Sequence, residues 1–420
     1  MRLLSSRVTF LAVLAVSSGV HLFSQTTPVF KFSAPLEVLL QPTTTPVHVQ
    51  FVASGDVNGD HNTDLLTNVG FTPELLLGNG KGGFTEKLIT NGPNPNIDIN
   101  SLLIDVNGDG FADYISTYGG GYDEQNGCQE TPGSLNVFLG DGRGNFLTGN
   151  TYSINPSTNI SIAVGDFNHD GNPDLALVSY STDDCAPAPA QSNLVILLGN
   201  GRGGFTSSYN ATVGSSATSL VIGEFSGNGL LDLAYTAVSF RTNLPEIDTL
   251  DGNGDGTFRA GPTYVTDTSR VGLIAAGNLN GDRRTDLVVN LGAKSAAGAQ
   301  PKIASLLAKV TEGFYWQSAL YSQDLFPNQL YLNYQLIDLN GDGKLDLLLP
   351  FVSATGQWAT RLSAGEGTGT FQTPQTILSQ ATYGDPVAVA LTRGGLPDIL
   401  LFPTHASDTP TIEVLLNESK

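Results

Sequence analysis

An acidic nine-residue loop that recurs along the chain limits the possible folds more than any other sequence feature. Its clearest copy runs from Asp338 to Asp346, with oxygen-bearing side chains at positions 1, 3, 5 and 9 and glycine at positions 4 and 6. Calcium takes six to eight oxygen ligands in flexible geometry, and glycine lets the backbone turn sharply. The EF-hand loop begins similarly but ends in Glu at position 12 and needs flanking helices. Here an apolar run, residues 347–349, follows at once. We therefore interpret the segment as a calcium loop between two β-strands.

The loop returns at the spacing of a structural unit. The closing aspartates stand at 64, 113, 174, 232, 286, 346 and 398, so seven copies are separated by 49 to 61 residues. Four copies keep all four oxygen side chains, and a fifth begins with Asn instead of Asp. We expect four to five calcium ions, held by Asp56, Asn58, Asp60, Asp64, Asp105, Asn107, Asp109, Asp113, Asp166, Asn168, Asp170, Asp174, Asn278, Asn280, Asp282, Asp286, Asp338, Asn340, Asp342 and Asp346.

The two remaining copies are degenerate. The fourth has Glu224 and Ser226 in the loop, and whether it binds calcium stays open. The seventh, with Leu391, Arg393 and Gly395 in the loop, keeps only its closing aspartate and is expected to be empty. The alternative for every copy is a solvated hairpin turn, because Asn-Gly and Asp-Gly are common turn sequences.

Each loop lies within the same pattern of strands. An apolar strand precedes it, as at residues 160–164, and a nearly continuous apolar run follows it, as at residues 175–178. A third strand ends in a glycine-rich turn and a phenylalanine, as at residues 75–84, and a fourth strand follows. Strands that are apolar on both sides must be covered on both faces. Four strands in each of seven units predict an all-β fold, a seven-bladed β-propeller of four-stranded antiparallel blades.

The loop, the apolar strand, the Leu-Gly-Asn-Gly turn and the phenylalanine together resemble the FG-GAP (VCBS-type) repeats of the integrin α-subunit propeller and its secreted bacterial relatives. The resemblance covers about residues 30–420. It implies that each loop joins the first and second strands of a blade and binds calcium on one edge of the ring. The connections between second and third strands, and between fourth and first strands, then lie on the opposite edge.

The two ends of the chain carry separate signals. Residues 1–24 have a basic start at Arg2 and Arg7 and a short apolar core, which is typical of a secretory signal peptide. We therefore expect a secreted or extracytoplasmic protein with a single domain, residues 25–420, and no membrane span in the mature chain. The last unit lacks a fourth strand. Residues 29–40 resemble the segment that follows each phenylalanine, so we expect an N-terminal strand to complete the last blade and close the ring.

Composition and motifs exclude several functions. A formal net charge of −20 argues against nucleic acid and anionic membranes as partners. The five histidines do not cluster in the sequence, and there is no Gly-x-Ser-x-Gly elbow, His-Glu-x-x-His motif or phosphate loop. His61 and His169 fall inside calcium loops, where we interpret them as turn residues.

The long connections expected on the opposite edge point to binding, because rigid scaffolds present ligand sites on loops. They contain Tyr118, Tyr122, Tyr180, Phe240, Phe351 and Trp358. Exposed aromatic side chains of this kind stack on sugar rings or anchor a protein surface. We predict a binding or cell-adhesion module for an extracellular glycan or protein. A lyase-like polysaccharide enzyme and a purely structural extracellular protein remain open.

The only two cysteines, Cys128 and Cys185, fall in corresponding long connections of adjacent units. Such connections are spatial neighbours in a propeller, and an oxidising compartment favours their pairing. We predict a disulfide between them.

Overall fold

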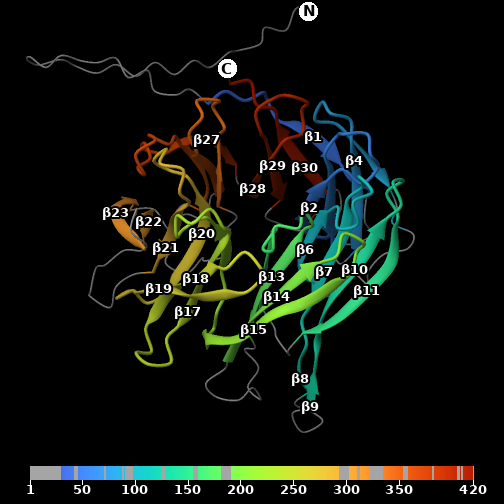
Figure 1. Cartoon of the computed structure of the whole chain (residues 1–420). Helices are drawn as coiled ribbons and strands as arrows, with labels where there is room; N and C mark the ends of the chain where they lie inside the picture. Colours follow the sequence, from blue (N-terminus) through green and yellow to red (C-terminus); the bar gives the residue numbers. More distant parts are fainter. Residues whose placement is uncertain are drawn as a thin grey trace, which may run out of the picture.

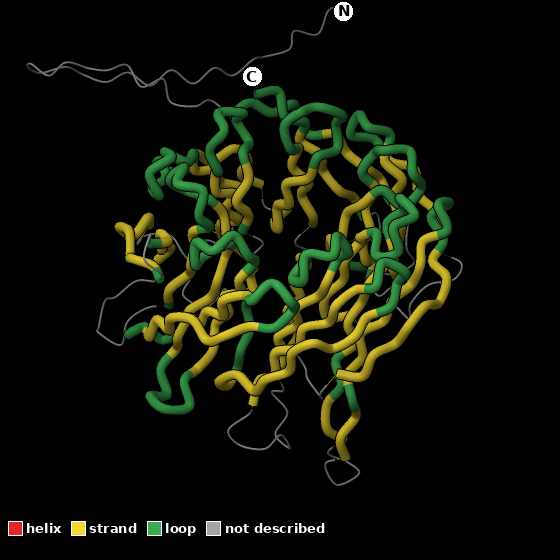
Figure 2. Tube along the Cα trace, viewed as in Figure 1, coloured by secondary structure: helices red, strands yellow, loops and turns green. Residues whose placement is uncertain are grey.

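The structure is a computed structural model, and it describes residues 30–41, 46–70, 72–87, 89, 98–123, 129–154, 159–180, 191–292, 302–309, 313–321, 334–352, 358–380, 383–403, 407 and 410–419. Every regular element in these residues is a β-strand. The sheets stand side by side in a ring, joined by turns and loops (Figures 1 and 2). Within the described part of the chain, no helix could cross a membrane.

The strands form antiparallel sheets that follow one another along the chain. The first two sheets contain β2 (Val49–Gly55), β3 (Asp64–Val69), β4 (Thr72–Gly78) and β5 (Phe84–Lys87), and then β6 (Asp98–Ile104), β7 (Asp113–Tyr118), β10 (Gly133–Gly140) and β11 (Phe146–Ile154). A small hairpin between β7 and β10 consists of β8 (Gly121–Asp123) and β9 (Gln129–Thr131). The longest sheet contains β12 (Asn159–Gly165), β13 (Asp174–Tyr180), β14 (Gln191–Gly199), β15 (Phe205–Ser215), β16 (Leu220–Gly223), β17 (Asp232–Val238), β18 (Pro245–Gly252) and β19 (Phe258–Val265).

Three further sheets complete the ring. Two of them contain β20 (Val271–Gly277), β21 (Asp286–Leu291), β22 (Lys302–Ala308) and β23 (Phe314–Tyr321), and then β24 (Gln335–Ile337), β25 (Asp346–Val352), β26 (Trp358–Ser363) and β27 (Gln375–Gln380). The last contains β28 (Tyr383–Val389), β29 (Asp398–Pro403), β30 (Thr411–Leu415) and the N-terminal strand β1 (Leu36–Leu39).

The sheet count corrects the prediction of seven four-stranded blades. Among the described residues, five sheets have four strands, whereas β12 to β19 form one eight-stranded sheet. The two halves of this sheet meet at one residue pair, Ser215 of β15 opposite Val238 of β17. The ring therefore contains five four-stranded blades, not seven, and the third and fourth sequence units share a continuous sheet.

The expected closure of the ring by the N-terminus is confirmed. Strand β1 pairs antiparallel with β30, from Leu36 opposite Val414 to Leu39 opposite Thr411, and the two strands lie side by side in Figure 1. Phe32 bridges Asn417, as Phe84 pairs with Gly78 in the first unit. The ends of the chain therefore complete one sheet between them and leave no open edge on β30.

The hydrophobic core lies between neighbouring sheets. Strand β13 is buried at all of its positions, as its continuous apolar run predicts. Between the last and first sheets, Leu65 and Leu76 belong to the same buried cluster as Leu400 and Val414. Each sheet thus contributes both of its faces to packing, which is why the second strand of each unit is apolar on both sides.

Two glutamates lie among these packed strands, and no ion pair to either is present among the described residues. Glu74 on β4 and Glu86 on β5 each have one buried carboxylate oxygen with no hydrogen-bond partner among the described residues. Burial, followed by the charge of Glu86, raises the pKa of Glu74 to about 7. A carboxyl group whose pKa is raised on folding favours the folded state at low pH. That contribution is present below the unfolded pKa of about 4.5 and is lost as pH rises to about 7.

We therefore predict that Glu74→Gln increases the free energy of unfolding at pH 8 by about 1–3 kcal/mol. The same substitution is expected to have little effect at pH 4.5, where the native carboxyl group is already largely protonated. Denaturant unfolding of both proteins across this pH range measures the difference. A gain that is equal at both pH values would show that the charge of Glu74 is not its source.

Candidate functional site

The predicted metal loops lie on one edge of the ring, together with the turns between third and fourth strands. Hydrogen bonds connect them from one unit to the next. The backbone N–H of Gly203 donates to the carbonyl of Val106 at 3.2 Å, and the N–H of Ala112 donates to the carbonyl of Asp56 at 2.8 Å. Equivalent bonds join Gly256 to Phe167, Gly369 to Leu279 and Thr285 to Glu224. The loops therefore form a belt that couples neighbouring sheets.

Inside each full loop, the side chains at positions 1, 3 and 5 bond to the loop backbone. In the first loop, the Asp56 carboxylate accepts the N–H groups of Gly59 and His61, both at 2.8 Å. Asn58 Oδ1 accepts the N–H of Asp60 at 3.0 Å, and Asp60 Oδ1 accepts the N–H of Asn62 at 2.8 Å. The loops that begin at Asp105 and Asp338 repeat this pattern. Local side-chain-to-backbone bonds thus fix the three oxygen-bearing residues on one short turn.

The turn requires left-handed backbone at positions 4 and 6. Gly59 (φ 73°) and Gly341 (φ 76°) show it at position 4. His169 (φ 58°) stands at position 4 of the third loop, and His61 (φ 63°) and Arg283 (φ 73°) stand at position 6 of theirs. Both histidines are exposed, which agrees with their interpretation as turn residues.

The closing aspartate of each loop makes backbone hydrogen bonds that its predicted role as a calcium ligand did not include. Asp64 is completely buried. Its Oδ2 accepts the N–H of Val57 at 3.0 Å, and its Oδ1 accepts the N–H of Gly78 at 2.8 Å. It therefore ties the loop to the end of the third strand. The same pair of bonds, with the same complete burial, recurs at Asp113, Asp174, Asp232, Asp286, Asp346 and Asp398.

We call this buried carboxylate with its two backbone bonds the aspartate clasp. Sequence reasoning assigned position 9 to calcium alone and missed the clasp. A signal was present, because Asp232 and Asp398 persist in the two copies whose other ligand positions have changed. A residue that survives the loss of its supposed co-ligands has a role of its own.

The clasp also explains the glycine that ends most third strands. A Cβ on Gly78 would lie 2.1 Å from the carbonyl oxygen of Thr63, the residue before Asp64. The same close approach to the preceding carbonyl occurs at Gly140, Gly199, Gly252 and Gly365. Ala308 occupies this position in the fifth unit and still donates its N–H to Asp286 at 2.8 Å.

Burial and the neighbouring loop charges disfavour the charged form of the closing aspartates. Burial raises the pKa of Asp64 to about 6, against the lowering effect of its two backbone bonds, and the charges of Asp60 and Asp56 raise it further. Asp113 and Asp346 show the same causes and the same value. The loop of Asp286 begins with Asn278, so Asp282 is the only loop charge that raises the pKa of Asp286.

Among the described residues, no group of three or more His, Cys, Asp or Glu side chains is gathered closely enough to hold a metal ion. The donor set nevertheless fits calcium, because oxygen donors at positions 1, 3 and 5 share a short turn and carry charges that a dication would neutralise. The clasp aspartate lies behind them, with both of its oxygens already accepting backbone bonds.

The two degenerate loops keep the aspartate clasp but have different residues at positions 1, 3 and 5. In the fourth, the side-chain Oε1 of Glu224 accepts a long bond of 3.4 Å from the N–H of Gly229. In the seventh, the bonds of Asp398 set a register in which Ala390, Thr392 and Gly394 occupy positions 1, 3 and 5. The guanidinium of Arg393 donates to Asn62 Oδ1 at 3.0 Å and to the carbonyl of Asp60. The seventh loop thus places a cation against the first loop.

The opposite edge carries some of the predicted aromatic residues. Tyr118 and Phe240 are exposed there, with 36% and 52% of their surface accessible, whereas Tyr180 is buried. The side chains of Tyr122, Phe351 and Trp358, and both cysteines of the predicted disulfide, lie outside the described residues. So does the predicted signal peptide.

Sequence reasoning missed Trp316, whose side chain is 44% exposed on the outer strand β23. It stands two residues after Phe314, whereas the equivalent positions in other units hold Glu86, Thr148, Ser207, Ala260 and Thr373. A large aromatic residue on an outer strand where other units have small or polar residues is the signal that could have identified it.

Comparisons with known proteins agree with this architecture. Residues 105–177, which run from the second metal loop through the third, match the FG-GAP-like repeat family. No curated protein matches the chain. A similar solved structure is that of an Agrocybe aegerita lectin, described as specifically recognising non-reducing terminal N-acetylglucosamine. The two are 17% identical with a TM-score of 0.49, over 79% of this chain and 80% of that one. The repeat match over residues 105–177 and the ring of antiparallel sheets together support an FG-GAP repeat β-propeller.

Proposed function

We propose that this chain is a secreted, calcium-stabilised propeller that acts as a binding or adhesion module for an extracellular glycan or protein. The observation that carries the proposal is the repeated loop, which places Asp or Asn oxygens at positions 1, 3 and 5 on a fixed turn in five units. Calcium would be held by these oxygens and would neutralise carboxylates that otherwise repel each other. The clasp aspartates would orient each loop from behind.

The arrangement assigns different tasks to the two edges of the ring. The loop edge is occupied by the hydrogen-bonded belt, which connects neighbouring units through backbone bonds. The opposite edge carries exposed Tyr118 at the end of β7 and exposed Phe240 on the connection between β17 and β18. A rigid scaffold with adaptable connections on one side is the usual arrangement of a binding module.

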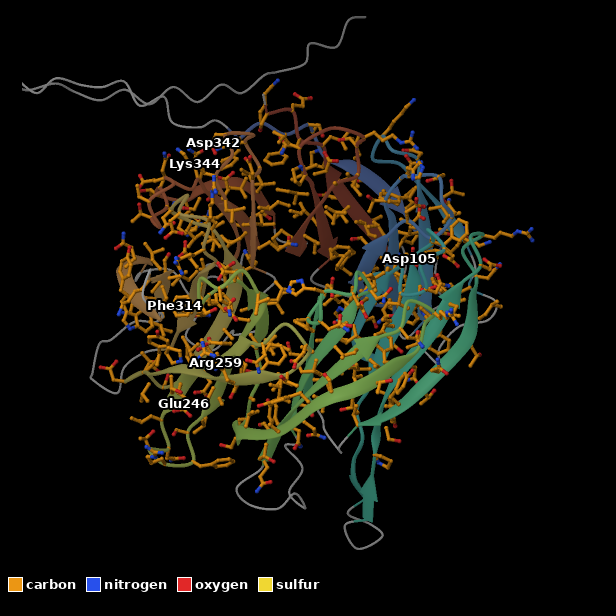
Figure 3. The ribbon with its side chains drawn as sticks, in the orientation of Figure 1. Asp105, Glu246, Arg259, Phe314, Asp342 and Lys344 are labelled. Atoms are coloured by element: carbon orange, nitrogen blue, oxygen red, sulfur yellow. The ribbon has the colours of Figure 1, made fainter. Side chains whose placement is uncertain are left out.

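Calcium is expected to raise the melting temperature of the purified protein, and EDTA is expected to lower it. A ligand that binds only the folded state stabilises it by about 2.7 kcal/mol per site at a hundredfold excess over the dissociation constant. Several sites acting together should give a large shift. Asp342→Asn is expected to reduce the calcium-dependent gain, since it removes one loop carboxylate but keeps the oxygen that accepts the N–H of Lys344. Asp342 and Lys344 lie together in the loop (Figure 3).

Asp255→Asn is the matched control. Asp255 is exposed in a turn outside the loops and accepts the N–H of Thr257 at 2.9 Å, so its replacement removes one surface carboxylate without touching a ligand position. The calcium-dependent gain should be unchanged in this variant. A melting curve of the wild type that is identical with calcium and with EDTA would overturn the metal assignment.

The binding role is tested by a glycan array probed with the calcium-loaded and the EDTA-treated protein. We expect selective binding that weakens after chelation, because loss of calcium loosens the ring that positions the opposite edge. A parallel assay for polysaccharide cleavage separates a binding module from an enzyme. Turnover without calcium-dependent binding would contradict the proposal.

A further inference from the structure

A pocket of about 310 Å³ lies between the eight-stranded sheet and the next sheet along the chain. One side consists of Val265, at the end of β19, and the connection to β20, which supplies Thr266, Asp267 and Thr268. The other side consists of Trp316 and Gln317 on β23. Leu291, Lys302 and Ala304 lie between them, at the end of β21 and the start of β22. Val265, Leu291 and Lys302 stand at the strand ends that are remote from the predicted metal loops.

The pocket has an apolar base and walls that combine an aromatic platform with polar groups. Leu291 and Ala304 are buried, at 4% and 2% exposure. Trp316 is 44% exposed and presents a broad apolar surface with one N–H donor. Asp267 supplies a carboxylate and Lys302 an ammonium group. The lining thus offers stacking, hydrogen-bond donors and acceptors, and both signs of charge within one small volume.

Hydrogen bonds hold the polar wall in place. Thr268 Oγ1 donates to the carbonyl of Arg270 at 2.9 Å, and Thr266 Oγ1 donates to the carbonyl of Pro245 at 2.9 Å. Both threonines are buried, so their positions are fixed by the protein and not by solvent. On the other wall, Gln317 Nε2 donates to the carbonyl of Thr368 at 3.3 Å. The pocket is therefore preorganised, which lowers the entropy cost of binding.

We propose that this pocket binds a saccharide ring, with the apolar C–H face of the sugar stacked on the Trp316 indole and its hydroxyl groups bonded to Asp267 and Lys302. The inference rests on the proposed binding function and gives it a site and a ligand class. A saccharide suits this lining because it has an apolar face and a dense set of hydroxyl groups, each both donor and acceptor. The volume is at the lower end of the range for small-molecule pockets, which is about 300–1,000 Å³. One or two sugar units are the expected occupant.

The test compares Trp316→Ala with Tyr315→Ala in the full, calcium-loaded protein. Tyr315 is also 44% exposed on β23 but does not line the pocket, since successive side chains of a strand point to opposite sides. Isothermal titration uses methyl glycosides of neutral hexoses, N-acetylhexosamines and uronic acids. For the glycoside that the wild type binds best, we expect Trp316→Ala to weaken affinity about tenfold or more. Tyr315→Ala should leave the affinity unchanged, and both variants should keep the wild-type melting temperature within about 2 °C.

A second measurement does not depend on a pocket variant. The chain has two tryptophans, so Trp358→Phe leaves Trp316 as the only reporter of indole fluorescence. We expect saturable quenching or a shift of its emission on addition of the bound glycoside. Unchanged emission at saturation would overturn the site.

The outcomes separate this inference from the proposed function. If the wild type binds a glycoside and Trp316→Ala binds it equally well, the pocket assignment is wrong and the binding function stands. If no glycoside and no glycan on the array binds the wild type, both the site and the glycan role fail. If the wild type binds a protein ligand and Trp316→Ala abolishes that binding, the saccharide assignment is wrong and the pocket is a protein-interaction surface.

Discussion

A chain that begins at residue 46 is expected to lose about 3–5 kcal/mol of folding free energy relative to one that begins at residue 30. The shorter chain lacks β1 and its register with β30. It also loses the backbone bonds that join Ser33 to Leu416, Leu40 to Pro410 and Glu418 to Lys31. The free energy falls because β30 becomes an open edge and the buried Leu40 leaves the cluster between the last and first sheets.

Denaturant unfolding of the two chains measures this difference, with calcium present in both samples. The longer chain is the proper control because it keeps every described contact of the N-terminal segment, including the Lys31–Glu418 ion pair at 3.0 Å. That exposed pair should contribute little, so Lys31→Ala in the longer chain should change stability by less than about 1 kcal/mol. If the two chains unfold at the same denaturant concentration, the closure of the ring by β1 contributes nothing to stability.

Asp398→Asn is expected to destabilise the protein by about 2–4 kcal/mol even in EDTA. Asp398 is completely buried, and its two oxygens accept the N–H groups of Leu391, Thr392 and Asn417. An amide in its place retains one acceptor oxygen and turns an N–H group toward another, so at least one buried donor loses its partner. The seventh loop has no other carboxylate, so this substitution tests the aspartate clasp separately from calcium.

The matched control is Asp342→Asn in the same EDTA buffer. Asp342 is also a loop carboxylate, but it lies at position 5 and its backbone bond survives the change to Asn. The free energy of unfolding of the Asp342→Asn variant should differ from that of the wild type by less than about 0.5 kcal/mol. Equal losses for the two variants would mean that burial and the backbone bonds at position 9 do not set the clasp apart.

The repeated units were predictable because their signals are local. Each loop, each following apolar run and each glycine–phenylalanine turn has a strand boundary at its own position, as at Asp64, Gly78 and Phe84. The closing strand was predictable by counting, since the last unit lacks a strand and the N-terminus supplies a matching one. The fusion of the third and fourth units was not predictable, because it depends on one pair, Ser215 with Val238, between strands with no sequence mark for pairing.

The candidate sites were predictable only in part, for reasons that concern geometry. A sequence gives the spacing of oxygens in a loop but not the direction of each side chain. The Asp64 side chain points inward toward the N–H groups of Val57 and Gly78. The sequence pattern, which matches that of a calcium ligand, gave no indication of this direction. The role of Trp316 could not be predicted for another reason. Its pocket combines residues from four strands and a connection that are far apart in sequence. Only the packing of two sheets brings them together.

The count of bound calcium ions is the most direct test of the central claim, that this ring is a calcium-loaded scaffold. Native mass spectrometry of the protein, dialysed against calcium and then against EDTA, resolves each bound ion by its mass. We predict about four to five ions per chain after calcium dialysis and none after EDTA. The Asp342→Asn variant should carry one ion fewer than the wild type, and Asp255→Asn should carry the same number. A wild-type chain that retains no calcium at millimolar concentration would contradict the account.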